Sequence, residues 1–540
     1  MKKSNFLQGA MVATFAIVIC KILGLLYVIP FYNIIGTKGG ALYSYAYSIY
    51  SIFLSLSTCG IPVAVSKLVS EYNALENYTL KEKIYKMAAN IMILIGLISF
   101  LLMFIFAEQI AYMFIGDITG GNTIEEVTVA IRVISTALLI VPQQSVLRGY
   151  LQGHKMISTT SISNVIEQLV RVIIIILGSY ITVKILNLPV NYAVYIAIFS
   201  ATIAALSSYI YLKIKIKNNK NELNLNENKK VEVSKKDLIK KIVFYALPFV
   251  IIDFIKSLYG IVDSVTVVKT MVNLGYSVEI AETTFGVIAT WGTKLNMIII
   301  SISMGMTISL VPNIASYFVK KDYKQVNEKI NQSFSLILFL TIPMALGISF
   351  LAKPIWVVFY GYSEISINIF RIFIIQVIFY GLYITAINIA QTMNDTKLSL
   401  ISLFGSFVLK AALNIPMMYL LKNIGIEAYY GPTITNALVE GLTFIIVILV
   451  LKKKYKLEYK NTFKVLIKSI FCVLIMLVAL YILSLIFKIN SISRLMSIVY
   501  IIVYAVIGAI SYFVLATKTG LLKDALGTSN IKEFIKSMKH

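Results

Sequence analysis

The feature that most constrains this fold is a series of apolar runs, most of about 20 residues or more, spread over nearly the whole 540-residue chain. A helix of about 20 apolar residues crosses the hydrocarbon core of a bilayer, where backbone groups must be hydrogen-bonded internally. Hydrophobic residues make up 58% of the sequence and charged residues only 14%, which is outside the range of soluble domains. The sequence therefore predicts an all-α polytopic membrane protein.

Fourteen predicted spans account for the apolar runs. We place them at residues 8–35, 41–69, 86–107, 127–147, 158–183, 191–212, 243–268, 284–311, 331–352, 365–390, 398–421, 432–451, 465–487 and 495–516. The first twelve are expected to form two six-helix lobes, and the last two to be an added pair. The first apolar run is too long for a signal peptide and is interpreted as a retained helix.

The longest polar interruption, from Lys213 to Lys241, sets the orientation. It holds ten lysines against four acidic residues, and lysine-rich loops stay on the cytoplasmic side. With this loop inside, the cytoplasmic segments carry 34 lysines and arginines and the outer connections carry seven. Both termini are then expected to be cytoplasmic. The net charge of +24 fits loops beside anionic membrane lipids rather than nucleic-acid binding.

The spans predict six segments along the chain. They are an N-terminal lobe at 1–212, a cytoplasmic lysine-rich linker at 213–242, a C-terminal lobe at 243–451, a cytoplasmic loop at 452–464, a helix pair at 465–516 and a cytoplasmic tail at 517–540.

Short motifs recur in the two lobes. GIPVAVS at residues 60–66 closes the second span, and LVPNIAS at 310–316 closes the eighth. LQGHK at 151–155 follows the fourth span, and AQTMNDTK at 390–397 follows the tenth. The similar offsets of the two motif pairs, 250 and 239, predict two copies of one bundle, with chance resemblance as the alternative. A binding site between repeated bundles is a transporter plan.

Twelve charged residues fall inside the predicted spans. Eight are basic, namely Lys21, Arg132, Arg171, Lys256, Lys294, Arg371, Lys410 and Lys468, and four are acidic, namely Glu167, Asp253, Asp263 and Glu440. A charge at mid-membrane costs about 2.5–3.5 kcal/mol, so these side chains are expected to pair, to snorkel or to line a wet cavity. The excess of basic residues suits an anion such as a lipid phosphate or diphosphate, and it does not suit an organic cation.

Some of these charges have an expected partner. Glu167 and Arg171 are four residues apart, so a structural ion pair is predicted. Lys468 lies near the inner end of its span and is expected to snorkel. Asp253, Lys256, Gly260 and Asp263 share one face of the seventh span, which predicts a buried charged stripe along that helix. For Lys21, Lys294, Arg371 and Lys410, an interhelical ion pair and a substrate contact both remain open.

Five motifs near the start of the chain resemble one family. They are KILGLLYVIPF at 21–31, IGTKGGALY at 35–43, GIPVAVSKLV at 60–69, RGYLQGH at 148–154 and EQLVR at 167–171. Together they are similar to the polysaccharide-exporter branch of the MOP (multidrug/oligosaccharidyl-lipid/polysaccharide) superfamily, in the Gram-positive group of MurJ (YtgP) and stage V sporulation protein B. The resemblance implies two six-helix lobes in a V, and a groove for a lipid tail at helices 13 and 14. It also implies flipping of lipid II, the undecaprenyl-diphosphate-linked peptidoglycan precursor, between leaflets.

The chain departs from better-known relatives in its cavity residues. Those relatives carry arginines on spans 1, 2 and 8, whereas the nearest basic residues here are Lys21 and Lys294, and span 2 has Leu54-Ser55 in the corresponding region. Our candidates for substrate contact are Lys21, Lys294 and Arg371, together with Arg148, Gln152 and His154 at the inner end of the fourth span. The last three could contact the headgroup, form a gate or simply make a turn at the lipid boundary.

Ion coupling is the role expected for a second group. Some relatives resemble sodium-driven transporters, with an acid on span 7 and polar groups on spans 11 and 12, where this chain has Asp263, Asn414, Thr435 and Glu440. Because Lys410 also lies in span 11, we predict that its ammonium takes the place of sodium and pairs with Asp263 or Glu440. The three cysteines lack metal-ligand spacing, and no cofactor or metal is expected.

Two other classes compete with a flippase. A drug/cation antiporter of the related MATE type shares the helix plan but would need an acid-biased cavity. A membrane glycosyltransferase or polymerase would need acids or histidines at surface loops, and the chain has only two histidines, His154 and His540. We therefore predict a transporter without enzymatic activity. Its cargo is lipid II or another undecaprenyl-linked cell-wall polysaccharide, and other cell-wall synthesis proteins are candidate partners.

Overall fold

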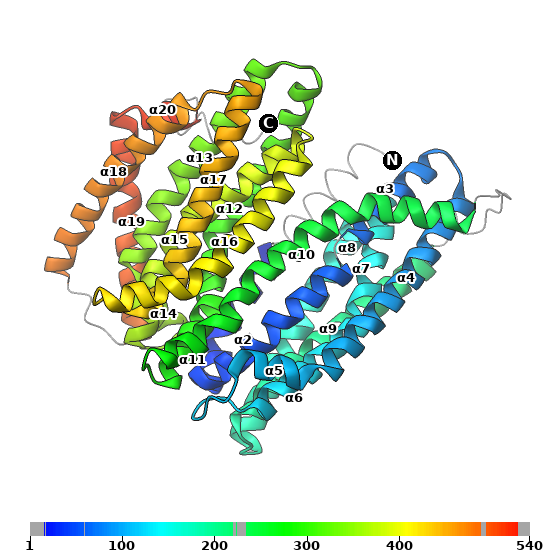
Figure 1. Ribbon diagram of the computed structural model, residues 1–540, viewed down its shortest axis with the longest axis horizontal. Helices are drawn as coiled ribbons and strands as arrows, with labels where there is room; N and C mark the ends of the chain where they lie inside the picture. Colours follow the sequence, from blue (N-terminus) through cyan, green and yellow to red (C-terminus); the bar gives the residue numbers. More distant parts are fainter. Residues whose placement is uncertain are drawn as a thin grey trace. The chain divides into compact units, whose positions relative to one another are not determined.

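The computed structural model describes residues 16, 18–58, 60–219, 223, 234–487 and 493–526, with the side chains of 57, 235, 248 and 302–312 left undescribed. Nearly all of these residues lie in helices (Figure 1), and the described ranges contain no strand, so the predicted all-α fold is confirmed. The chain divides by packing into two units, residues 1–269 and 270–540.

The boundary between these units lies inside a helix. It falls within α10 (Lys235–Asn273), whereas the sequence separates the lobes at the linker 213–242, most of which lies outside the described residues. Most of the predicted tail, 517–540, also lies outside them. The six segment boundaries remain a prediction.

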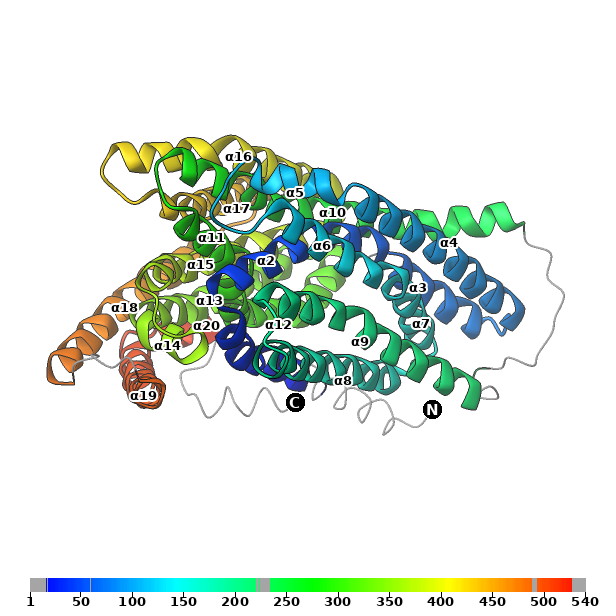
Figure 2. The same ribbon diagram turned by 90° about the horizontal axis from the view of Figure 1, so that it is seen from below.

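The first unit is a bundle of long helices with short breaks. After a helical segment at 18–26 it contains α2 (Val28–Thr58), α3 (Ile61–Ala74), α4 (Tyr78–Ile105), α5 (Ala107–Ile115), α6 (Ile124–Ser135), α7 (Val141–Gly153), α8 (Ile157–Ile173), α9 (Val190–Asn218) and most of α10. A 3-10 turn joins α6 to α7, and two π turns continue α8 to Ile185. The views in Figures 1 and 2 show α7, α8 and α9 side by side.

Two glycines divide the region predicted as the first two spans. Gly36 has φ 64° and ψ −166° and kinks α2, and Gly60 has φ 76° and separates α2 from α3. A Cβ at Gly60 would stand 2.5 Å from the carbonyl oxygen of Ala246 on α10. Glycine is required there because the backbone lies in the left-handed region and α10 passes too closely for a side chain.

The second unit repeats this plan and adds a helix pair. It contains α11 (Val278–Gly286), α12 (Gly292–Val319), α13 (Tyr323–Phe350), α14 (Ala352–Tyr360), α15 (Glu364–Thr392), α16 (Thr396–Asn423), α17 (Gly431–Tyr455), α18 (Lys460–Ile486), α19 (Arg494–Lys518) and α20 (Leu521–Leu526). A π turn lies between α11 and α12, and a 3-10 turn precedes α17. The added helices pack on this unit, α18 against α13 and α19 against α14 (Figure 1).

Helix boundaries recur at fixed offsets in the two units. The helices α4 and α13 have the same length, and so do α5 and α14, which follow them directly. The starts of both pairs share one offset in numbering, 245. The starts of α8 and α16 have the offset of 239 that the sequence predicted. The duplicated plan is therefore visible in the helix lengths and in their order.

The motif LVPNIAS does not occupy the position equivalent to GIPVAVS. The ends of α3 and α12 are 245 residues apart in numbering, whereas the two motifs are 250 apart. The predicted equivalence of the two motifs is therefore wrong. GIPVAVS begins at the break before α3, where Pro62 lies in the first turn, whereas LVPNIAS lies inside α12. A short motif recurs by chance more easily than a helix length does.

Ten helices among the described residues are long and apolar enough to cross a membrane. Each predicted span coincides with a helix or a run of helices, the first only in part because residues 8–15 lie outside the described ranges. The total of fourteen crossings remains a prediction. The short helices α5, α14 and α20 were not predicted.

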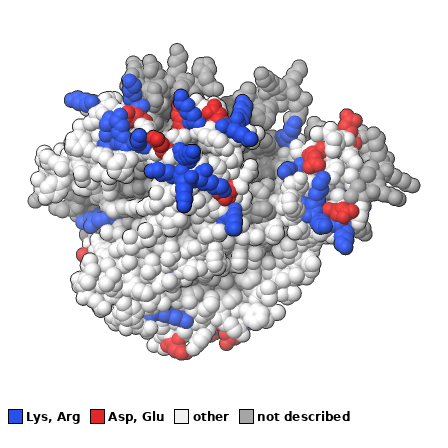
Figure 3. All heavy atoms as spheres, turned by 45° about the horizontal axis from the view of Figure 1, so that its top comes forward, with Lys and Arg blue, Asp and Glu red and all other residues white. Residues whose placement is uncertain are grey.

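Charged side chains gather at helix ends. Figure 3 shows most of the visible lysines, arginines and acids in the upper part of the view and a few at its lower edge, with a broad and largely uncharged surface between them. In the second unit, Asp524 of α20 pairs with Lys464 at 2.9 Å and Lys468 at 2.6 Å, both on α18. Lys468 also donates to the carbonyl oxygen of Thr519, so its ammonium reaches the polar helix end, as predicted for a snorkelling lysine. Burial raises the pKa of Asp524, but hydrogen bonds from both lysines outweigh this and hold the pKa below its ordinary value.

Candidate functional site: polar clusters and an apolar groove

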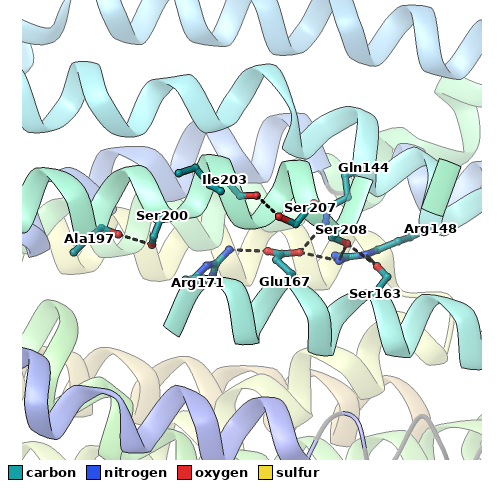
Figure 4. Close-up of polar contacts among 10 residues, drawn as sticks. All are labelled: Gln144, Arg148, Ser163, Glu167, Arg171, Ala197, Ser200, Ile203, Ser207 and Ser208. Atoms are coloured by element: carbon teal, nitrogen blue, oxygen red, sulfur yellow. Dashed lines mark hydrogen bonds and ion pairs between the residues drawn. The ribbon is translucent and has the colours of Figure 1, made fainter. Parts of the chain in front are cut away.

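An ion-pair network joins three helices in the first unit (Figure 4). Glu167 on α8 accepts a hydrogen bond from Arg171 Nη2 at its Oε1, at 2.6 Å, and from Arg148 Nη2 of α7 at its Oε2, at 2.7 Å. Each carboxylate oxygen thus has its own guanidinium. The network carries one net positive charge, and its three side chains are 16–26% exposed.

Neutral side chains complete this network. Gln144 on α7 donates to Glu167 Oε2 at 2.8 Å, while Arg148 donates to the hydroxyls of Ser163 on α8 and Ser208 on α9, both at 3.0 Å. The two serine hydroxyls lie 2.8 Å apart. In an apolar bundle such partnered networks hold helices in one register, because breaking any member leaves polar groups unpaired. We name the group formed by Arg148, Glu167 and Arg171 the arginine clamp.

The arginine clamp contains the predicted Glu167–Arg171 pair and a residue for which sequence suggested another role. The sequence left Arg148 open as a headgroup contact, a gate or part of a turn at the lipid boundary, and in the structure it pairs with Glu167 across the helix interface. The spacing of residues along α8 predicts the Glu167–Arg171 pair within that helix. It cannot show which side chain of α7 packs against Glu167.

A buried donor of the arginine clamp is unused in the described structure. Arg171 Nε is buried and has no hydrogen-bond partner among the described residues. Tyr43, Tyr47 and Tyr50 of α2 are near enough to Arg171 to interact with it electrostatically, and the first two rings stack with centroids 4.4 Å apart. Arg171 Nε can therefore donate a hydrogen bond to a further acceptor group beside these three tyrosines.

Lys21 lies on the helical segment that passes this region. A Cβ at Gly24 would stand 3.4 Å from Gln168 Nε2 on α8, which places the segment against the helix carrying Glu167. Its neighbour Cys20 is close enough to Glu167 and Arg148 to interact electrostatically, and Lys21 itself is exposed. The structure thus positions this predicted contact residue in the same part of the unit as the arginine clamp.

Gln152 and His154 lie in separate environments from Arg148. Gln152 is exposed and borders a groove of about 590 Å³ formed with α3, which also presents Lys67 and Glu71. His154 packs edge-on against Tyr150, with ring centroids 4.7 Å apart. The three residues predicted together at this membrane boundary therefore do not form one site in the described structure.

His154 should make stability depend on pH. Burial, and next the charge of Lys81, lower its pKa from 6.5 to about 4. Between these values the unfolded chain binds a proton that the folded chain does not, so this contribution to stability is complete above pH 6.5 and is lost as pH falls to about 4. We expect the melting temperature in detergent to fall less between pH 7 and pH 5 in His154→Phe than in wild type. Equal falls would contradict this assignment.

The predicted charged stripe on α10 faces α2. Lys256 pairs with Asp253 at 3.4 Å, and both border a cavity of about 460 Å³ together with Gly260 and residues of α2. Asp263, the fourth member of the stripe, is only 5% exposed and does not line this cavity. The prediction of a buried stripe is therefore wrong for Asp253 and Lys256, which are accessible, and right only for Asp263.

Two predicted substrate contacts lie in the second unit. Lys294, in the first turn of α12, has its ammonium 5.1 Å from the ring centroid of Trp291. Arg371 is exposed on α15. Phe373 of α15 packs against the start of α12, since a Cβ at Gly292 would stand 2.9 Å from its ring. The start of α12, which carries Lys294, therefore packs against the helix that carries Arg371.

A buried polar cluster lies where α15, α16 and α17 pack together. Lys410 and Glu440 are each 1% exposed and Asn414 is fully buried, one turn from Lys410. Gln376 of α15 donates to Glu440 Oε1 at 2.8 Å. Asp263 belongs to the other unit, so the predicted pairing of Lys410 with an acid, and its role in ion coupling, remain predictions.

An apolar groove of about 340 Å³ runs between α13, α14, α18 and α19. Small residues open it, namely Pro343 and Gly347 on α13 and Ala505, Gly508 and Ala509 on α19. Tyr512 donates its hydroxyl to the carbonyl oxygen of Phe339 at 2.8 Å, so its ring lines the groove while its polar atom is satisfied. A groove with so few polar atoms suits a hydrocarbon chain. The spacing of the small residues on α19 was not among the sequence features that predicted a groove, although it is the signal that could have indicated this wall.

Comparisons with known proteins agree with this architecture. The sequence model of the family described as polysaccharide biosynthesis protein matches residues 6–278, and that of the MatE family matches residues 288–416. Lipid II flippase MurJ of Bacillus subtilis (strain 168) is 31% identical over 533 residues, which cover 97% of this chain and 97% of that protein.

Solved structures extend the agreement to the fold. A structure of lipid II flippase MurJ in an inward closed conformation has a TM-score of 0.66 at 16% identity, over 94% of this chain and 98% of that chain. An inward-facing MATE-family multidrug resistance transporter of the MOP superfamily has a TM-score of 0.64 at 14% identity, over 82% of this chain and 98% of that chain. With its two repeated helical units and added helix pair, the chain is a multi-pass membrane protein that belongs to the polysaccharide biosynthesis protein family, in the MurJ-like group of the MOP superfamily.

Proposed function

We propose that this chain is a flippase that moves a lipid-linked oligosaccharide, lipid II in the first instance, from the inner to the outer leaflet by alternating access. The observation that carries the proposal is the apolar groove that α18 and α19 build on the second unit. A transporter of small soluble drugs has no need of such a groove, whereas a polyprenyl tail must remain in an apolar environment while its headgroup crosses. The similarity to a protein named lipid II flippase supports the same cargo.

Each part of the cargo has a proposed place. The prenyl tail lies in the groove beside α19, and the diphosphate approaches Lys21, Lys294 and Arg371. A lysine ammonium acts as a point charge rather than as the bidentate fork of an arginine, so this diphosphate grip is looser geometrically. Lys410 and Glu440 are assigned to coupling rather than to cargo, because both are almost fully buried.

The membrane potential alone can assist this movement. With the inside negative by about 100 mV, each negative charge that moves outward gains about 2.3 kcal/mol. A doubly charged diphosphate gains roughly twice that amount, so the proposal needs no sodium gradient. We place the chain in a bacterial plasma membrane with both termini cytoplasmic. This orientation rests on the excess of basic residues in the segments predicted to be inside.

The second candidate function is a MATE-type drug/cation antiporter. The match of the MatE family model to residues 288–416 favours it. Its discriminating requirement is a cavity with more acids than bases, which the residues within the spans do not supply. Export of a different undecaprenyl-linked polysaccharide is the remaining alternative and would use the same groove.

Removing both proposed diphosphate contacts tests the flippase. We expect Lys21→Gln/Lys294→Gln to lower the outward appearance of lipid II in reconstituted vesicles by at least tenfold, because two cationic contacts are lost together. The assay scores accessibility of the headgroup to an external modifying enzyme. The matched control is Lys460→Gln, which removes a lysine from an exposed surface pair. Undiminished flipping in the double variant would reject these contacts.

A further inference from the structure

The polar cavity between α2 and α10 in the first unit is lined by side chains that differ from those expected at a diphosphate site. It has a volume of about 460 Å³, within the range of sites that bind small molecules. Ser51, Ser55 and Thr58 line it from α2, and Asp253, Lys256 and Ser257 line it from α10. All of these residues belong to one packing unit.

The hydroxyls in this cavity have already used their protons. Ser51 donates to the carbonyl oxygen of Ser48 at 2.8 Å, Ser55 to that of Ile52 at 2.8 Å and Thr58 to that of Leu54 at 2.7 Å. Ser257 has two acceptors within reach, the carbonyl oxygen of Asp253 on its own helix at 2.9 Å and that of Ser51 on α2 at 3.5 Å. Since a hydroxyl has one proton and two lone pairs, each of these four groups keeps lone pairs that can accept hydrogen bonds from a ligand while its proton is bound to a backbone carbonyl.

The one charged pair in the cavity is neutral overall and accessible. Lys256 and Asp253 are 37% and 36% exposed, and they are joined at 3.4 Å, which is a long hydrogen bond. The ammonium has donors to spare and the carboxylate has a free oxygen. The cavity therefore presents a row of acceptors, one strong acceptor and one strong donor, without net charge.

This pattern selects among ligand classes. A diphosphate only accepts hydrogen bonds at neutral pH, so Lys256 is the one side chain here that could donate to it, the acceptor row gives it no partner and Asp253 repels it. A metal ion needs oxygen ligands converging within about 2.0–2.6 Å, whereas residues 51 to 58 extend along roughly 10 Å of helix. A sugar carries hydroxyls and amides that both donate and accept, over a ring of this extent.

We propose that the cavity between α2 and α10 is a carbohydrate subsite, which holds a sugar of the lipid-linked headgroup while cationic residues elsewhere hold its diphosphate. Asp253 and Lys256 bind adjacent hydroxyls or an acetamido group, and the α2 hydroxyls accept from the others. This assignment rests on the proposed function. It predicts that the protein binds the sugar and the diphosphate through different residues, so that binding of one can be weakened without weakening binding of the other.

Gly260 offers a clean way to fill the cavity. A Cβ at this position meets no heavy atom within 4 Å, so a larger side chain enters the cavity without striking the backbone. Gly405 on α16 is a matched control, since it is also helical, also has open space around a Cβ and lies in the other unit. The variants are Gly260→Phe and Gly405→Phe, with Asp253→Asn/Lys256→Gln as a second test that keeps side-chain size.

The measurement is the affinity of the purified full-length protein for three lipids, namely undecaprenyl diphosphate with no sugar, with one sugar-peptide unit and with two sugars. We expect Gly260→Phe and the double variant to weaken binding of the two-sugar lipid at least tenfold and that of bare undecaprenyl diphosphate less than twofold. Gly405→Phe should leave all three affinities unchanged. Equal losses for bare and glycosylated lipids, or no loss, would overturn the subsite.

Wild type separates this proposal from the proposed function. If wild type binds all three lipids with one affinity, the carbohydrate subsite is wrong while transport of lipid-linked diphosphates stands. If wild type binds none of the three, the proposed function fails and the subsite fails with it. A sugar-dependent gain in wild type that only the cavity variants lose supports both.

Discussion

Replacing Glu167 with glutamine is expected to lower the stability of the protein by about 3–5 kcal/mol, the range for removing one partner of a buried ion pair. Glu167 is the only acid of the arginine clamp, and both of its oxygens bind guanidinium groups, at 2.6 and 2.7 Å. Without its charge, Arg148 and Arg171 face each other as like charges within the bundle. The measurement is the melting temperature in detergent, taken from the fraction of protein that remains monodisperse after heating.

The control for this prediction is an ion pair of the same chemistry at the surface. Glu458 pairs with Lys460 at 3.4 Å, but the two side chains are 63% and 89% exposed. Exposed pairs contribute about 0–1 kcal/mol, so Glu458→Gln should leave the melting temperature nearly unchanged. Glu167→Asp, which keeps the charge on a shorter arm, should fall between the two. If Glu167→Gln melts like Glu458→Gln, the arginine clamp does not hold α7, α8 and α9 together.

Filling the apolar groove is expected to reduce flipping at least tenfold with little loss of stability. A Cβ at Gly508 would lie 3.5 Å from Leu480 Cδ1, an ordinary contact, so Gly508→Phe projects an aromatic ring along the groove wall. The ring takes the volume in which the prenyl tail is proposed to lie, and each displaced methylene forfeits about 0.8 kcal/mol of burial. The measurement is lipid II flipping in vesicles, normalised to folded protein.

Val506→Phe is the matched control on the same helix. Val506 is 52% exposed and does not line the groove, so the same aromatic ring is added to the outer face of α19. Flipping should then remain near the wild-type rate. A pair of variants that flip equally well would remove the groove from the mechanism, and equal losses would point to a general disturbance of α19.

The positions of the helices were predictable because the bilayer imposes one strong rule. A stretch such as residues 331–352 or 465–487 must be helical if it is to bury its backbone, and helices cover both. The Glu167–Arg171 pair was equally predictable, since residues four apart share a helix face. The repeat was visible in the sequence. The motif at residues 310–316, however, lies five residues beyond the position equivalent to residues 60–66.

The candidate site was predictable only as a set of charges. Arg148, Gln152 and His154 are close in sequence on or beside α7, and a helix turns successive residues by about 100°, so they face a carboxylate, a groove and a tyrosine respectively. The cavity between α2 and α10 could not be foreseen either. It depends on which face of each helix meets the other, and the hydroxyls of α2 give no signal of their own.

The amino-acid sequence by itself determined an all-helical membrane protein with a duplicated plan, and it predicted spans that carry more bases than acids, because these follow from apolar length, local spacing and counts of charge. Only the tertiary structure decided that Glu167 binds two arginines, that Asp253 and Lys256 border a cavity with serines of α2, and that α13 and α19 open a groove at small residues. These features arise where helices distant in the chain pack together, and packing depends on the shapes of both partners at once.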